Sequence, residues 1–252
     1  MPSATLVIVA QPIEQVLGEV SGLTVVYGAT TALGGVDLQI RAGEFVAIMG
    51  RSGSGKSTLL HCLAGLQTPT SGKVFLVGQA LTGLGRTALA KHRRAATALV
   101  FQSYNLVPFL SVVDNVALPG AISGHGWNRT AALAALGDVG LTDLARSKPA
   151  LLSGGEQQRA AIARALAGDQ PLILADEPTG ALDTANGHAV LDLLRAVPAA
   201  GSRAVAMVTH DPMAASYADR VVILRDGLVV GEVIGGGTAE IAAVLAQPGS
   251  AA

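Results

Sequence analysis

The chain has 252 residues, of which 50% are hydrophobic and 14% charged, and its formal net charge is −1. This composition excludes an intrinsically disordered chain, and it offers no basic surplus for nucleic-acid binding. A single cysteine, Cys62, excludes an internal disulfide.

The first quarter of the chain is predicted to be rich in strands. Residues 1–17 are apolar and lack Lys and Arg, which argues against a secretory signal, and we expect them to form an extension. Loose alternation and β-branched residues predict strands at 20–27 and 36–40. A short apolar strand at 44–49 then runs into a glycine-rich loop, and a helix is predicted over 56–66.

Strands and helices alternate through the rest of the chain. Four further stretches read as strands: 73–77, 97–101, 172–175 and 204–208. The last two are continuous apolar runs, which is typical of parallel strands buried on both faces. Helical patterns cover 111–144, where Asn128 is placed as an N-cap, and 155–167. This order predicts an α/β core with a parallel sheet and a helical insertion over about 103–165.

We expect one main domain over residues 18–236, followed by a C-terminal helix and tail over 237–252. The densest basic cluster, Lys91-His92-Arg93-Arg94, is interpreted as a solvated helix end. No segment reads as a clean span of about 20 apolar residues, so we expect any membrane association to go through a partner.

The spacing Gly-x4-Gly-Lys-Ser indicates a phosphate-binding loop between the predicted strand and helix. Glycines let backbone N–H groups turn toward phosphate oxygens, and the helix N-terminus adds partial positive charge. Lys56 is expected to reach the terminal phosphates, and the Ser57 hydroxyl to bind Mg²⁺. The predicted nucleotide-binding residues of this segment are Gly50, Arg51, Ser52, Gly53, Ser54, Gly55, Lys56, Ser57 and Thr58.

Two carboxylates, Asp176 and Glu177, follow the apolar strand at 172–175. An isolated Asp-Glu pair is commonly an exposed turn, but beside a phosphate loop the pair favours catalysis. We expect Asp176 to orient Mg²⁺ through water and Glu177 to polarise the water that attacks the γ-phosphate.

Three more side chains are candidates because of their places at strand ends. His210 follows the strand at 204–208 and could hydrogen-bond the γ-phosphate, although a lone histidine there is more often structural. Gln102 follows the strand at 97–101 and could contact Mg²⁺ or water. Tyr27 could stack on adenine, with a purely structural tyrosine as the alternative.

Residues 152–157, Leu-Ser-Gly-Gly-Glu-Gln, place a glycine turn where the helix at 155–167 starts. Together with Ala181-Leu182-Asp183 and the motifs above, in this order, they resemble the ATP-binding cassette (ABC) family of transporter ATPases. The resemblance covers about residues 20–230. It implies a P-loop NTPase fold, with a RecA-like core and mixed sheet, an antiparallel β subdomain and an inserted α-helical signature subdomain.

The resemblance also implies how the site works. In this family two cassettes stack head to tail, and ATP lies between the phosphate loop of one and the signature of the other. The trans residues are then Ser153, Gly154, Gly155 and Glu156. In the same reading Glu177 and His210 are catalytic, and Mg²⁺ is bound by Ser57 and Gln102. The expected assembly is a homodimer that closes on ATP and opens after hydrolysis.

Segments 100–108 and 114–119 look like the macrolide-export and lipoprotein-release branch. That likeness implies a cytoplasmic subunit, peripheral on the inner face of the membrane through a separately encoded permease, without nucleic acid, acting in export or in force transmission. The alternative is a soluble ABC ATPase of iron–sulfur assembly, DNA repair or the ribosome. A catalytically silent binding module conflicts with the presence of Lys56, Glu177 and His210.

Overall fold

The computed structural model describes residues 15–124, 126–199 and 201–246, and its centre is a six-stranded sheet with the order β10-β9-β3-β8-β7-β6. The strands from β9 to β6 run parallel, and β10 pairs antiparallel with β9. Their bounds are β3 Phe45–Met49, β6 Thr97–Val100, β7 Leu172–Asp176, β8 Ala204–Thr209, β9 Arg220–Arg225 and β10 Leu228–Ile234. Every residue of β3, β7 and β8 is buried, which confirms the prediction from their apolar runs.

A second, antiparallel sheet has the order β2-β1-β4-β5. Its strands are β1 Val16–Tyr27, β2 Thr30–Arg41, β4 Ser71–Leu76 and β5 Gln79–Ala80. The first two are longer than predicted, because pairing across the hairpin extends from Tyr27 and Thr30 to Val16 and Arg41, with register shifts where polar residues and glycines interrupt the alternation. The strand β1 includes the last two residues of the expected 1–17 extension, and Leu17 is buried. Residues 1–14 of that extension lie outside the described residues.

Eight α-helices are described: α1 Lys56–Leu63, α2 Arg86–Ala96, α3 Val112–Ile122, α4 Arg129–Asp138, α5 Gly154–Leu166, α6 Thr184–Ala199, α7 Pro212–Ala215 and α8 Thr238–Ala246. Short 3₁₀ turns lie at Thr142–Leu144 and Pro149–Leu151. The helical pattern at 111–144 resolves into α3 and α4, and the Asn128 side chain accepts a hydrogen bond from the Ala131 N–H at 3.0 Å, as a cap should. The helix α1 ends earlier than predicted, before Gly65, whose φ is +62°. Within the described ranges, no helix has the length and apolar character needed to cross a membrane.

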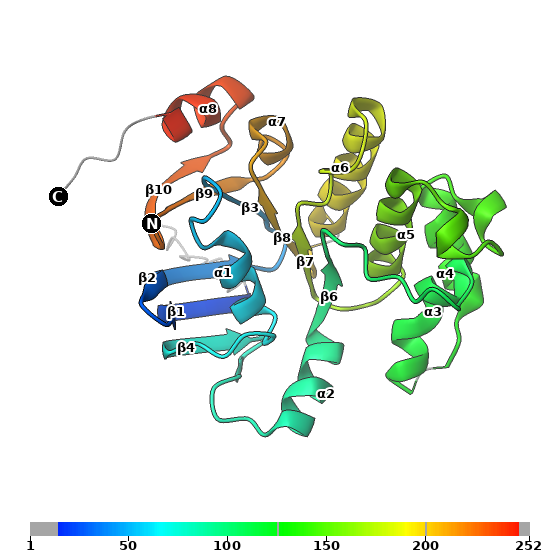
Figure 1. Ribbon diagram of the computed structural model, residues 1–252, viewed down its shortest axis with the longest axis horizontal. Coiled ribbons are helices and arrows are strands. Elements are labelled where there is room, and N and C mark those ends of the chain that lie inside the picture. Colours follow the sequence, from blue (N-terminus) through cyan, green and yellow to red (C-terminus); the bar gives the residue numbers. More distant parts are fainter. Residues whose placement is uncertain (1–14, 125, 200, 247–252) are drawn as a thin grey trace, which may run out of the picture.

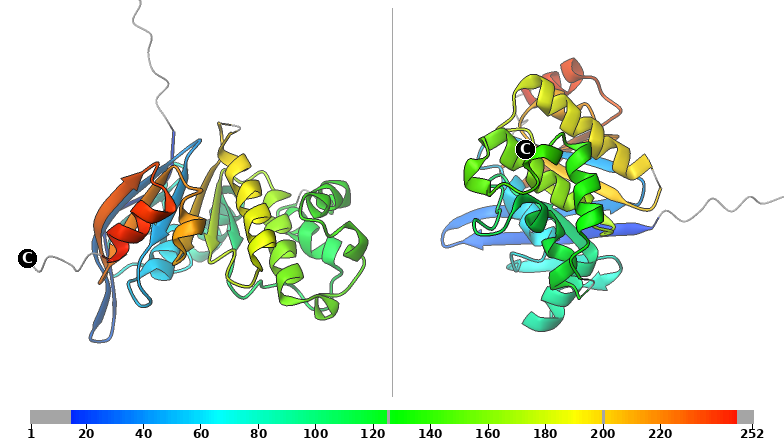
Figure 2. Two further views of the ribbon diagram at one scale, coloured as in Figure 1. Left: turned by 90° about the horizontal axis from the view of Figure 1, so that it is seen from above. Right: turned by 90° about the vertical axis from the view of Figure 1, so that its right-hand side faces the viewer.

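The core sheet is buried on both faces. Along β3, Phe45 and Met49 join a cluster with α3, α4, α5, α6, α7 and α8, whereas Val46 and Ile48 join a cluster with α1 and the antiparallel sheet. Figure 1 shows β1, β2 and β4 on one side of the core and α3, α4 and α5 on the other, and the view from above in Figure 2 agrees. The core sheet therefore lies between a β-sheet layer and a helical layer.

Candidate active site

The phosphate loop lies between β3 and α1, as its spacing predicts. Gly53 and Gly55 have φ values of +80° and +98°, which suit glycine, and a Cβ on Gly55 would lie 2.4 Å from the Ala32 carbonyl oxygen of β2. The Ser54 hydroxyl is buried and has no hydrogen-bond partner among the described residues. An unpaired buried hydroxyl inside a glycine loop fits an oxygen-rich ligand such as a phosphate.

Lys56 begins α1 and is only 9% exposed. Its Nζ donates to the carbonyl oxygens of Gly50 and Arg51, both at 2.9 Å, so the ammonium is held inside the loop. Burial lowers the pKa of Lys56, and the nearby charges of Glu177 and Asp176 oppose that shift. A desolvated ammonium with weak neutral partners is ready to exchange them for a phosphate.

Three side chains predicted to act on Mg²⁺ come from separate parts of the chain. The Ser57 hydroxyl lies 3.2 Å from Asp176 Oδ1, although the residues are 119 positions apart. Gln102 is exposed on the loop after β6, and it lines a hollow of about 470 Å³ together with Asp176. A hydroxyl, a carboxylate and an amide carbonyl are the hard oxygen donors that Mg²⁺ prefers, so the residues fit the ion.

Glu177 follows β7 in a left-handed backbone conformation, with a φ of +49°. Its N–H donates to the Val208 carbonyl at 3.0 Å, which ties the turn to β8. Its Oε1 lies 2.8 Å from His210 Nδ1, and the exposed fractions are 14% for the Glu177 side chain and 72% for that of His210. A strained backbone at a carboxylate that faces a histidine is typical of a functional site.

The Ser-Gly-Gly turn forms the N-terminus of α5. Ser153 is the N-cap, and its N–H donates to Glu156 Oε2 at 2.7 Å while the Glu156 N–H donates back to Ser153 Oγ at 3.3 Å. The Ser153 hydroxyl also donates to Glu156 Oε2 at 2.9 Å, and the two bonds that Ser153 donates to this carboxylate lower the pKa of Glu156. Ser153 and Gly154 are exposed, so the start of the helix faces outward.

The segment Ala181-Leu182-Asp183 lies against the same helix start. A Cβ on Gly155 would lie 3.4 Å from the Leu182 side chain. The Asp183 carboxylate accepts from the Asn186 N–H at 2.9 Å, and Asn186 in turn accepts from Arg159 of α5 at 2.8 Å. The order of the motifs along the sequence does not reveal that this loop contacts the Ser-Gly-Gly turn of the same chain.

Tyr27 ends β1 opposite Thr30 and is about half exposed. The predicted stacking on adenine stays a prediction. The neighbouring strand β2 does reach the phosphate loop, since the Ala32 carbonyl lies against Gly55.

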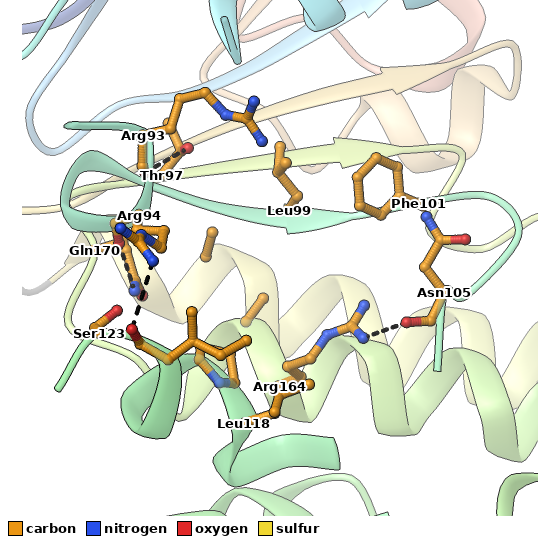
Figure 3. Close-up of a pocket in the computed structure, with 14 residues that line it drawn as sticks. Arg93, Arg94, Thr97, Leu99, Phe101, Asn105, Leu118, Ser123, Arg164 and Gln170 are labelled. Atoms are coloured by element: carbon orange, nitrogen blue, oxygen red, sulfur yellow. Dashed lines mark hydrogen bonds between the residues drawn. The ribbon is translucent and has the colours of Figure 1, made fainter. Parts of the chain in front are cut away.

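A groove of about 270 Å³ separates β6 from α3 and α5, and Figure 3 shows its lining. Its walls are mainly apolar, and three arginines line it: Arg93, Arg94 and Arg164. Burial lowers the pKa of both Arg93 and Arg164. The basic cluster at 91–94 is therefore the end of α2, as predicted, but Arg93 is half-buried rather than solvated. Arg164 is not among the predicted site residues. The sequence feature that could have indicated it is its position as the one charged residue in the alanine-rich run at 160–167.

Comparisons with known proteins agree with this geometry. The family model described as ABC transporter matches residues 33–180. The macrolide export ATP-binding/permease protein MacB of Nitrosomonas europaea is 48% identical over 202 residues, which are 79% of this chain but 30% of MacB. The chain thus spans about a third of the length of the MacB relatives that it matches.

Relatives that this chain covers almost completely are also similar to it in sequence and structure. The ABC transporter ATP-binding protein MJ0796 of Methanocaldococcus jannaschii is 45% identical over 205 residues, covering 79% of this chain and 87% of that protein. A dimeric structure of MJ0796 in a post-hydrolysis state, bound to ADP and Pi, superposes with a TM-score of 0.83 at 40% identity and covers 88% of this chain and 100% of that chain. For cbiO1 from Clostridium perfringens the TM-score is 0.76 at 28% identity, with 91% and 92% of the two chains covered. The chain therefore belongs to the ABC transporter family and carries the ATP-hydrolysing cassette of that family.

Proposed function

We propose that the chain is the energy-coupling subunit of a transporter, acting as a head-to-tail homodimer in which each ATP site combines two copies. One observation carries this proposal. The phosphate loop and Glu177 lie at the edge of the core sheet, whereas the exposed Ser153-Gly154 turn belongs to the helical layer, apart from α1 (Figure 1). An outward-facing helix N-terminus is a ready anion site, and a second copy can supply the phosphate.

Within one copy, we assign the binding of the nucleotide phosphates to residues 50–58 and stacking on the adenine to Tyr27. Ser57 and Gln102 would hold Mg²⁺, with Asp176 orienting it through water. When bound, Mg²⁺ neutralises charge on the β- and γ-phosphates. The chain's own residues do the rest: Lys56 leaves its two carbonyl partners for the terminal phosphates, and the Ser54 hydroxyl gains the partner that it lacks.

Glu177 would act as the general base for the attacking water, and His210 would hold the γ-phosphate and the Glu177 carboxylate in place. The 2.8 Å contact between His210 Nδ1 and Glu177 Oε1 supports this pairing, as does the strained turn that presents the carboxylate. From the other copy, Ser153, Gly154 and Gly155 would contact the γ-phosphate. Glu156 would act indirectly, because its side chain holds the Ser153 N–H and hydroxyl.

This assignment makes a quantitative prediction for mixed dimers. In Ser153→Arg the signature is blocked, and in Lys56→Ala the phosphate loop is disabled, so each variant alone should be inactive. A dimer with one copy of each has one intact composite site. Equal mixing should therefore restore about a quarter of wild-type turnover, since about half of the dimers are mixed and each has one of two sites. Labelled copies show independently whether the subunits exchange. If they exchange and turnover does not recover, the signature does not act in trans.

We further propose that the dimer drives a separately encoded membrane permease of the macrolide-export or lipoprotein-release type, from the inner face of the membrane. The relatives named ATP-binding/permease proteins support a permease as the partner of the cassette, although in those relatives one protein carries both functions. The groove of Figure 3 is the docking site that we assign to it, because its apolar walls and three arginines complement an apolar segment with carboxylates.

Membrane fractionation in the native host tests the docking site. Ile122 is 54% exposed and lines the groove, whereas Leu133 is 43% exposed on α4 and lies outside the groove lining. Ile122→Asp should release the chain from the membrane fraction, and Leu133→Asp should leave it there. A wild-type chain found only in the soluble fraction would contradict the permease partner.

A further inference from the structure

The loop that follows β6 contains two consecutive residues in the left-handed region. Tyr104 has a φ of +61° and Asn105 a φ of +50°. Asparagine tolerates this conformation, but it is unfavourable for a bulky residue such as tyrosine, so the surrounding structure must hold Tyr104 in place. Gln102 lies two positions before this pair, on the same loop.

Arg164 supplies that hold from α5. Its Nη1 donates to the Asn105 carbonyl at 2.6 Å, and its Nη2 donates to the Tyr104 carbonyl at 2.8 Å. Figure 3 shows the guanidinium directed at the loop. A planar guanidinium can donate to two neighbouring acceptors at once, and hydrogen bonds from a charged donor are about twice as strong as neutral ones. The carbonyls of Tyr104 and Asn105 are thus held by one side chain.

The loop also touches the other end of α5. A Cβ on Gly154 would lie 3.1 Å from the Tyr104 hydroxyl, so the ring lies against the Ser-Gly-Gly turn. Gly154 and Arg164 are separated by about 15 Å along the helix. The loop of Gln102 is therefore in contact with α5 at its first turn and near its last turn.

We propose that Arg164 is a positioning residue: it holds the 104–105 turn so that Gln102 stays beside Asp176. The proposal rests on the function proposed above, in which Gln102 binds Mg²⁺ in one site while α5 serves the site of the partner copy. Arg164 also lines the groove of Figure 3, so a docked segment would contact the same side chain.

The test compares Arg164→Met with a matched control, Arg203→Met. Arg203 also donates to two backbone carbonyls, Gln170 at 2.9 Å and Ala165 at 3.4 Å, and burial also lowers its pKa, but these bonds do not reach the loop. Hydrogen exchange of the peptide covering 101–106 should become at least about tenfold faster in Arg164→Met and stay at the wild-type rate in Arg203→Met. Wild-type exchange of this peptide in Arg164→Met would overturn the proposal.

The Mg²⁺ dependence of ATP turnover gives a second readout, which a merely structural role of Arg164 would not change. Arg164→Met should lower ATP turnover by about 10- to 100-fold and raise the Mg²⁺ concentration for half-maximal activity, because its ligand is misplaced. Adding Arg164→Met to Gln102→Ala should cause little further loss, since both changes remove one function. If the loss of turnover in the double variant equalled the product of the two single losses, the proposal would be overturned.

Two further variants keep the outcomes distinct. If Arg164→Met does not fold, Arg164→Lys replaces the fork by a single ammonium, and exchange at 101–106 should be faster than in the wild type. A wild-type rate in Arg164→Lys would overturn the proposal. If Gln102→Ala alone leaves the Mg²⁺ dependence unchanged, the proposed role of Gln102 fails, whereas exchange at 101–106 still decides whether Arg164 holds the loop.

Discussion

Replacing Glu177 by glutamine should remove a proton acceptor and leave the shape of the site intact. The backbone at this position is held by the hydrogen bond from its N–H to the Val208 carbonyl at 3.0 Å, which does not depend on side-chain charge. Glutamine has the same shape as glutamate, and its carbonyl oxygen can still accept from His210 Nδ1, now 2.8 Å from Glu177 Oε1. Only the capacity to take a proton from water is lost.

The magnitudes follow from that distinction. General-base catalysis typically contributes about 10²–10⁴-fold, so the turnover of Glu177→Gln should fall by this factor. The free energy of unfolding should stay within about 1 kcal/mol of wild type, because volume and backbone bonds are kept. ATP affinity should change by less than about threefold, since Lys56 and the loop amides are untouched. ATP–Mg²⁺ should then trap the closed dimer.

Steady-state turnover, urea unfolding, nucleotide binding and light scattering with ATP–Mg²⁺ measure these four effects. Glu177→Asn is the control for backbone strain, because asparagine tolerates the left-handed region that Glu177 adopts at a φ of +49°. This variant should be inactive yet as stable as wild type or more stable by up to about 1 kcal/mol. Turnover of Glu177→Gln above a tenth of wild type would refute the general-base role, and a monomer at saturating ATP–Mg²⁺ would refute the composite site.

Two further variants test binding and stability. In Lys56→Ala, ATP affinity and turnover should both fall by more than about 100-fold, because the ammonium is the buried cation of the loop. A fluorescent nucleotide measures the affinity, and a wild-type affinity would show that Lys56 is not part of the site. Asn115→Ala should lower the free energy of unfolding by about 2–4 kcal/mol, because the fully buried amide accepts from the Val107 N–H at 2.6 Å and donates to the carbonyls of Val107 and Ser111 at 3.1 and 3.0 Å. Urea unfolding checks this against Asn128→Ala, which loses one exposed cap and should cost about 1 kcal/mol; equal losses would contradict the reasoning.

The local sequence pattern was sufficient to predict those elements whose residues favour a single conformation. The strands β7 and β8 are apolar at every position up to the residue that ends each strand, and they are buried on both faces. In the loop at 50–55, Gly53 and Gly55 lie where φ is positive, and α1 starts at the lysine that the spacing indicates. In these segments neighbouring residues alone restrict the backbone and the burial.

Long-range pairing decided the elements that the pattern missed. The strand β2 continues through Gly34 and Gly35 because β1 pairs with it from Tyr27 back to Val16. The strands β9 and β10 were not predicted, yet β9 lies parallel to β3 and completes the core sheet. The helix α6 was also missed, and its buried Val190, Leu191 and Leu194 pack on the core. Partners distant in sequence supply the hydrogen bonds and the burial in each case.

The sequence by itself determined which loops we expect to bind phosphate and which family the chain resembles, because each motif is contiguous and its spacing carries the chemistry. Only the tertiary structure decided which side chains meet. Ser57 and Asp176 approach across 119 residues, and Glu177 meets His210 across 33 residues, because β3, β8 and β7 are neighbours in the core sheet. Arg164 reaches Tyr104 across 60 residues because α5 packs beside β6, and such packing depends on the whole fold rather than on any local motif.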